Sequence, residues 1–242
     1  MTQANTRTLV TFLLDRTGSM EAIRDDTIGG FNAYLDGLKG DGEVAIDFTL
    51  VQFDSISIDK ICVAVPVAHV AKLTRDSYQP RASTPLIDAA VKTINAVEVS
   101  LRAAPAAKVV ICIQTDGQEN SSTEHNWAEL NTLVKQKSAQ GWQFNFMGVG
   151  IDAYEQGARM GIAPAATVAY DHRSAEATQA VFAASAENAR EYAAGRRPSS
   201  VYCEKQKSAA GDRFAGLFSG KPKSEKPKTA QLKKGIVDDI TL

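Results

Sequence analysis

The sequence predicts an α/β protein built on a doubly wound, mostly parallel sheet of about six strands, with one antiparallel edge strand and helices on both faces. Short continuous apolar runs alternate with longer segments whose apolar residues recur at helical spacing. Parallel strands that are buried on both faces give unbroken apolar runs, as in residues 8–15 and 107–115. The length of 242 residues allows one large domain of this class or two small ones.

The first part of the chain alternates strand and helix patterns. Residues 8–15, "TLVTFLLD", form an unbroken apolar strand, and residues 20–38 place apolar side chains at helical spacing around two adjacent glycines. Glycines inside a helix cost helix propensity, so this pair indicates close packing against a neighbouring backbone. Residues 43–54 alternate polar and apolar side chains. Residues 57–66 follow after a tight connection, which predicts an antiparallel partner at the sheet edge.

The alternation continues in the second part of the chain. Residues 84–101 predict an amphipathic helix with Pro85 in its first turn, where proline is tolerated, and residues 107–115 predict another buried strand. The remaining strand patterns are residues 142–150 and 166–171, and the remaining helical patterns are residues 124–139, 152–160 and 175–195. In such a sheet, ligands bind outside the carboxyl ends of the strands, near the point where the strand order reverses.

Charge is distributed unevenly along the chain, although the net charge is only −1. Residues 1–194 carry a net charge of −7, and residues 195–242 carry +6. The C-terminal part is rich in Lys, Ser, Pro and Gly. We therefore expect a domain at residues 1–195, followed by a basic, low-complexity, mostly flexible tail at residues 196–242. No aromatic residues interleave with the tail lysines, so neither nucleic acid nor a membrane is the expected partner.

The cysteines and the apolar runs predict a cytoplasmic protein. Cys62, Cys112 and Cys203 are odd in number and far apart, which indicates free thiols in a reducing compartment. The N-terminal residues show no signal-peptide pattern, and no apolar run is long enough to span a bilayer. The three histidines show no spacing typical of zinc ligands.

Oxygen-bearing side chains follow the ends of two predicted parallel strands. Asp15, Thr17 and Ser19 come at the end of the first strand, Asp116 follows residues 107–115, and Thr84 stands just before a predicted helix. If the two strands are neighbours, the three loops lie on one rim, where two carboxylates and three or four hydroxyls face one point. A ligand set of oxygen without nitrogen or sulfur suits a hard divalent cation, and Mg²⁺ and Mn²⁺ both accept it.

These segments resemble the three motifs of the von Willebrand factor A (VWA) domain and its metal-ion-dependent adhesion site (MIDAS). The segments "LLDRTGSM", "STPL" and "QTDGQENSS" occur in the family's order, and the resemblance covers about residues 8–194. It is greatest to small cytoplasmic members from bacteria and phages. It implies a Rossmann-like fold, direct metal contacts from Thr17 and Ser19, and direct or water-mediated contacts from the two aspartates and Thr84.

The resemblance also implies what such a site binds. In the family a carboxylate from a partner protein fills the open coordination position, so the implied function is a metal-dependent protein–protein interaction through an Asp or Glu of the partner. An ion neutralised by only two protein carboxylates attracts a third. Thr17 stands where the family usually has serine, so the hydroxyl is retained while the added methyl group narrows the pocket.

Each motif also has an ordinary structural interpretation. Asp15 can cap a polar turn, Thr84 can be the N-cap of the helix that follows it, and Asp116 can begin a turn with the glycine after it. Glu119 and Asn120 are expected in a solvated loop at the rim.

Two further hypotheses are open. Asp15 at a strand end beside Mg²⁺ is also the arrangement of a phosphotransferase or phosphatase nucleophile. Against this enzyme, Thr17 stands where the haloacid dehalogenase type of site has a second aspartate, and no other catalytic motif occurs. In the tail, Asp238 and Asp239 lie in an apolar frame, which makes this segment a candidate for docking on a partner or on the protein's own metal site.

Overall fold

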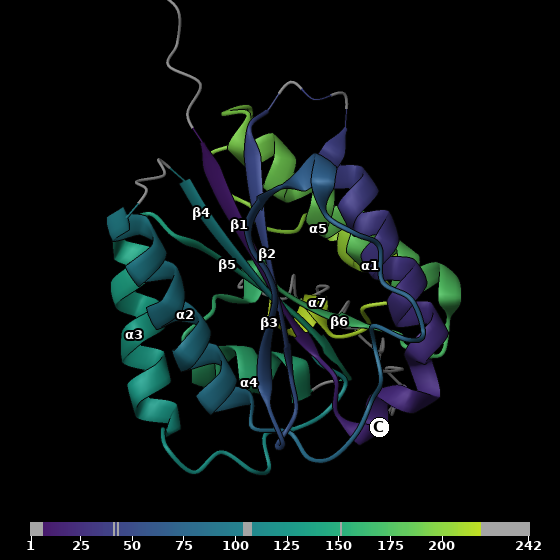
Figure 1. The fold of residues 1–242 in the computed structure, drawn as a ribbon. Helices are drawn as coiled ribbons and strands as arrows, with labels where there is room; N and C mark the ends of the chain where they lie inside the picture. Colours follow the sequence, from purple (N-terminus) through teal and green to yellow (C-terminus); the bar gives the residue numbers. More distant parts are fainter. Residues whose placement is uncertain (1–6, 41, 43, 104–107, 151, 219–242) are drawn as a thin grey trace, which may run out of the picture.

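A computed structural model describes residues 7–40, 42, 44–103, 108–150 and 152–218, and it shows a sheet between two layers of helices (Figure 1). The strands are β1 (Thr8–Asp15), β2 (Ile46–Phe53), β3 (Ile58–Pro66), β4 (Lys108–Gln114), β5 (Gln143–Val149) and β6 (Thr167–Tyr170). Their order is β3-β2-β1-β4-β5-β6, and only the β2–β3 pair is antiparallel among these strands. The predicted α/β fold class and its antiparallel edge strand are therefore confirmed.

The helices divide between the two faces of the sheet (Figure 1). On one face, α1 (Arg24–Lys39) packs against α5 (Ala175–Ala193). The other face carries α2 (Leu86–Ala103), α3 (Trp127–Ala139) and α4 (Asp152–Met160). The shorter helices are α6 (Glu204–Ala209), α7 (Ala215–Phe218) and the 3₁₀ segments Gly18–Ile23, Val67–His69 and Pro164–Ala166. Side chains alternate along β1, so Phe12 packs with α1 and α5 while Leu13 belongs to the core on the opposite face.

The strand order reverses between β1 and β4. These strands are parallel neighbours, with Leu14 of β1 opposite Gln114 of β4. Asp15 and Asp116 therefore follow adjacent strand ends on the same edge of the sheet. The polar loops were expected to converge only if these two strands are neighbours, and in the structure they are.

One of the two adjacent glycines in α1 allows the close approach of α5. Gly30 is buried, and a Cβ added there would lie 2.5 Å from the ring of the fully buried Phe182. Gly29 is exposed, and a Cβ there would meet nothing within 4 Å. The close packing predicted from the glycine pair therefore applies to Gly30 alone.

We expect Gly30→Ala to lower the free energy of unfolding by about 1–3 kcal/mol, because the added methyl group clashes with the Phe182 ring, which is fully buried and stacked on Phe12. Gly29→Ala is the matched control. It should stabilise the protein by up to about 1 kcal/mol through helix propensity. Urea denaturation of both variants measures the difference, and equal effects of the two substitutions would contradict this account of the α1–α5 contact.

The described part of the expected tail, residues 196–218, packs on the sheet and on α5. Tyr202 and Ala210 are buried, and Ser200 donates a hydrogen bond to Asn145 of β5 and accepts one from it. The sequence placed the end of the domain at residue 195, but residues 196–218 pack against it. Much of this packing is made by polar side chains, which the sequence pattern assigned to a flexible tail. The proposed docking residues at positions 238 and 239 lie outside the described residues.

Candidate metal centre

Four of the five predicted ligands form one connected set at the ends of β1 and β4. Ser19 donates a hydrogen bond of 2.7 Å from its Oγ to Oδ1 of Asp116. Its Oγ also lies 3.3 Å from Oγ1 of Thr17. Oδ1 of Asp15 accepts the backbone N–H of Thr17 at 2.7 Å, which closes the polar turn that follows β1. The fold thus joins the carboxylates of two separate loops through the hydroxyls between them.

The fifth predicted ligand, Thr84, reaches the same place from the start of α2. A Cβ added to Gly117 would lie 3.3 Å from Oγ1 of Thr84 and 3.6 Å from Oγ of Ser19. The two hydroxyls therefore both border the space beside the Gly117 backbone. A side chain at position 117 would fill that space.

Burial makes the two carboxylates electrostatically costly. Asp15 is fully buried, and this burial raises its pKa to about 7 despite hydrogen bonds from Thr115 and Thr17. Burial also raises the pKa of Asp116, with partial relief from the hydroxyl of Ser19 and from nearby His172. Neither carboxylate forms an ion pair with a residue that the structure describes. A cation bound between them would supply the missing positive charge.

The donor set fits a hard divalent cation. It combines two carboxylates with three hydroxyls and contains no nitrogen or sulfur ligand, which is the chemistry that Mg²⁺ and Mn²⁺ accept. Within the described residues, no cluster of three or more His, Cys, Asp or Glu side chains is arranged to hold a metal ion. Metal binding at the predicted site would therefore depend on the hydroxyls as much as on the aspartates.

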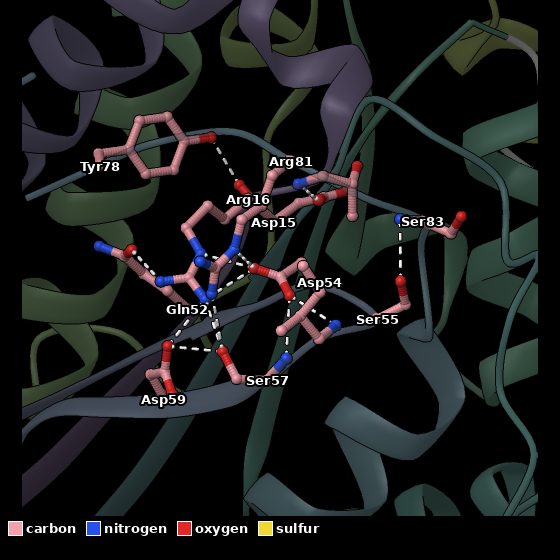
Figure 2. A network of polar contacts seen from close by, with 12 residues as sticks. Asp15, Arg16, Gln52, Asp54, Ser55, Ser57, Asp59, Tyr78, Arg81 and Ser83 are labelled. Carbon is pink, nitrogen blue, oxygen red and sulfur yellow. Dashed lines mark hydrogen bonds and ion pairs between the residues drawn. The ribbon is translucent and has the colours of Figure 1, made fainter.

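The side chain of Arg16, the residue after Asp15, lies in a polar network with Asp54 and Asp59 (Figure 2). Its Nε donates to Oδ2 of Asp54 at 2.9 Å, and its Nη2 lies 2.8 Å from Oδ2 of Asp59. Arg81 donates to the same Oδ2 of Asp54 at 3.0 Å. Oδ1 of Asp54 accepts the backbone N–H groups of residues 56 and 57.

This network lowers the pKa of Asp54, whereas the surroundings of Asp15 raise its pKa. Burial alone would raise the pKa of Asp54, but the backbone N–H groups together with Arg81 and Arg16 outweigh it and hold the pKa below its ordinary value. Asp54 is therefore a charged anchor for Arg16. The anchor fixes the start of the loop that carries Thr17 and Ser19.

A segment after β3, residues 74–83, fastens the same loop from its other side (Figure 2). The Tyr78 hydroxyl donates to the backbone oxygen of Asp15 at 2.6 Å. The backbone N–H of Arg81 donates to the oxygen of Arg16 at 2.9 Å, and the N–H of Gly18 donates to Ala82 at 3.0 Å. The loop of residues 15–19 is consequently held by backbone hydrogen bonds as well as by the arginine.

Three residues of the β4 loop have structural roles that the sequence did not predict. Thr115 donates its hydroxyl to Oδ2 of Asp15 and so links the two loops directly. Asn120 accepts the N–H of Thr84 through its side chain and donates its own N–H to the oxygen of Thr84. Glu119 accepts the N–H of Ile87 in the first turn of α2. The only sequence signal is the density of polar residues in "QTDGQENSS".

Solved structures of other proteins share this fold. The structure is similar to a von Willebrand factor type A protein from Catenulispora acidiphila, with a TM-score of 0.54 at 13% identity over 76% of this chain and 43% of that chain. It is also similar to the pilus adhesin SpaC from Lactobacillus rhamnosus GG, with a TM-score of 0.57 at 16% identity over 78% of this chain and 31% of that chain.

These likenesses establish the VWA fold, and the resemblance noted in the sequence is confirmed at that level. The chain spans less than half the length of either structure. No protein-family model matches the chain, and no curated protein does. Any assignment of a metal or a binding partner must therefore be argued from the residues of the candidate site.

Proposed function

We propose that this protein is a divalent-metal-dependent protein-interaction module. Mg²⁺, or Mn²⁺, binds between Asp15, Thr17, Ser19, Thr84 and Asp116, and an Asp or Glu of a partner protein completes its coordination. The proposal rests on the buried carboxylate of Asp15 and the partly buried carboxylate of Asp116, which converge with three hydroxyls and form no ion pair within the described residues. Two carboxylates leave a bound divalent ion attractive to a third.

Calorimetric titration with MgCl₂ tests the metal site. We expect one site in the wild-type protein and no measurable binding in Asp15→Ala or Asp116→Ala, because each variant removes half of the carboxylate charge. Asp76→Ala, at an exposed aspartate outside the candidate site, is the control and should bind Mg²⁺ like the wild type. Unchanged Mg²⁺ binding in both site variants would overturn the proposal.

The methyl group of Thr17 should tune the metal affinity. Thr17 is almost fully buried and its Oγ1 contacts Ser19. Removing its methyl group gives the candidate ligands more room and keeps the hydroxyl oxygen. We expect Thr17→Ser to tighten Mg²⁺ binding roughly fivefold, equivalent to about 1 kcal/mol, near the lower end of overpacking costs. The same titration measures this change, and weaker binding by the serine variant would show that the methyl group supports the loop.

The geometry favours this module over a phosphotransferase or phosphatase that uses Asp15 as nucleophile. The side chain of Asp15 is fully buried, and its two oxygens are oriented by hydrogen bonds from Thr17 and Thr115. A nucleophile must reach the substrate atom directly, whereas the resemblance allows Asp15 to contact a metal ion through water. Release of phosphate from a generic aryl phosphate, abolished in Asp15→Asn, would revive the enzyme.

We also propose that the protein works in the cytoplasm as a VWA domain of residues 1–195 with a C-terminal extension. Free thiols support a reducing compartment: Cys62, Cys112 and Cys203 form no disulfide. None of the described helices is long and apolar enough to cross a membrane.

A further inference from the structure

A cavity of about 290 Å³ opens at the carboxyl ends of β5 and β6, on the same edge of the sheet as the candidate metal centre. Its wall includes His172 and Arg173, which follow β6, and Arg213 and Phe214 from the C-terminal segment. A cavity of this size is at the small end of ligand sites and accommodates one side chain better than a cofactor.

The cavity lies near the predicted metal ligands. Asp116 follows β4 and His172 follows β6, and only β5 lies between these two parallel strands. At about 4.8 Å for each strand spacing, the two strand ends are about 10 Å apart. One ligand can therefore contact the metal position and the cavity together.

The C-terminal segment is held firmly where it forms the cavity wall. Oδ2 of Asp212 accepts the N–H of Ala169 in β6 and the hydroxyl of Tyr154 in α4. A Cβ added to Gly211, whose φ is +73°, would lie 2.9 Å from Cβ of Asp171. These contacts position Arg213 at the rim next to the end of β6. The part of the chain expected to be a flexible tail thus contributes a cationic side chain to this surface.

The cavity has unbalanced positive charge. Arg173 forms no side-chain hydrogen bond or ion pair with the residues that the structure describes. The side chain of Arg213 is 83% exposed and lies 3.9 Å from the carboxylate of Asp171. One carboxylate thus faces two guanidinium groups and an imidazole, which leaves this cavity complementary to an anion.

We propose that the partner is an acidic protein segment that presents two carboxylates, one to the metal ion and a second to the cavity between Arg173 and Arg213. This inference rests on the proposed function, because the first carboxylate needs the metal. A polyproline II segment advances about 3.1 Å for each residue and completes a turn in three residues, so acidic side chains three positions apart lie on the same side of it, about 9–10 Å apart. The partner motif is Asp or Glu, two other residues, and Asp or Glu again.

Fluorescence anisotropy with synthetic peptides tests the motif. The probes are labelled Gly/Ser peptides that carry one aspartate, two adjacent aspartates, or two aspartates three positions apart, each titrated with full-length protein in saturating MgCl₂. The two diacidic peptides have the same charge, so they separate spacing from general attraction. We expect the spaced peptide to bind about fivefold more tightly than the adjacent one, with an advantage that shrinks at high salt.

Variants separate this inference from the function on which it rests. The double variant Arg173→Ala/Arg213→Ala should lose the advantage of the spaced peptide while it keeps the wild-type affinity for Mg²⁺ and for the single-aspartate peptide. Arg102→Ala, at a 75% exposed arginine near the distant end of α2, should keep the advantage.

The two failures have different signatures. Equal binding of both diacidic peptides to the wild type, or a spaced-peptide advantage that persists in the double variant, overturns the two-carboxylate motif alone. Single-aspartate binding that is indifferent to EDTA and to Asp116→Ala overturns the proposed metal-dependent function itself.

Discussion

We expect the metal-free protein to lose roughly 4 kcal/mol of unfolding free energy as the pH rises from about 4 to about 8, and Mg²⁺ to restore much of it. The loss comes from Asp15, whose folded-state pKa is raised by burial to about 7 from an ordinary value of 3.8. Between these two values the folded carboxyl keeps a proton that the unfolded chain has released. Stability therefore falls with rising pH, at about 1.4 kcal/mol for each pH unit, and levels off above about pH 7.

Urea denaturation in EDTA at several pH values measures this loss, with Asp15→Asn as the informative variant. Asparagine keeps the shape of the side chain and an oxygen for the N–H of Thr17, but it has no charge to bury. We expect Asp15→Asn to be more stable than the wild type near pH 8 without metal, and to gain nothing from Mg²⁺. Asp76→Asn is the exposed control and should follow the wild type. Parallel pH profiles for the wild type and Asp15→Asn would contradict this prediction.

This result would show that the candidate site is built at the expense of stability. A buried carboxylate with no cationic partner is unfavourable in the folded protein alone and becomes favourable when a divalent ion is bound. A residue chosen only for folding would be apolar or amide at this position. The loss of stability caused by burying the Asp15 carboxylate therefore agrees with a role in binding. An aspartate that only capped a turn would not need to be buried so deeply.

Local patterns were sufficient to predict the sheet and to gather the candidate ligands. The unbroken apolar runs that became β1 and β4 located the two strand ends, and parallel strands place Asp15 and Asp116 on one edge. Thr84 was expected on the same rim because it stands just before a predicted helix, and the structure brings it to the other candidate ligands. Its ability to bind metal stays a prediction.

Structural roles that depend on contacts between polar residues far apart in the chain could not be predicted, because they give no local sequence pattern. Ser200 is buried because it pairs with Asn145, and Lys207 is buried because it donates to the backbone oxygen of Pro164. A hydropathy pattern predicts that polar residues of this kind are exposed to solvent. The segment after residue 195 was therefore predicted to be a flexible tail. Arg16 is a similar case, since its position between Asp15 and Thr17 gives no sign of a partner on the next strand.

We expect Asp54→Ala to lower the free energy of unfolding by about 3–5 kcal/mol, because it leaves the buried Arg16 without its principal counter-charge. The variant also frees the backbone N–H groups that Oδ1 of Asp54 satisfies. Asp59→Ala is the matched control. The Asp59 side chain contacts the same guanidinium but is 42% exposed, so its removal should cost less than about 1 kcal/mol. Urea denaturation compares the two variants, and similar losses would show that burial does not decide the strength of this network.

The same pair of variants tests whether the network positions the candidate metal loop. Arg16 lies between Asp15 and Thr17, so losing its anchor releases the backbone that aims both of them. Asp54→Ala should therefore weaken Mg²⁺ binding even at temperatures where the variant is fully folded. Gly30→Ala destabilises a distant helix contact and should leave Mg²⁺ affinity unchanged. If both substitutions weakened Mg²⁺ binding in proportion to their loss of stability, Arg16 and Asp54 would support the fold without positioning the loop.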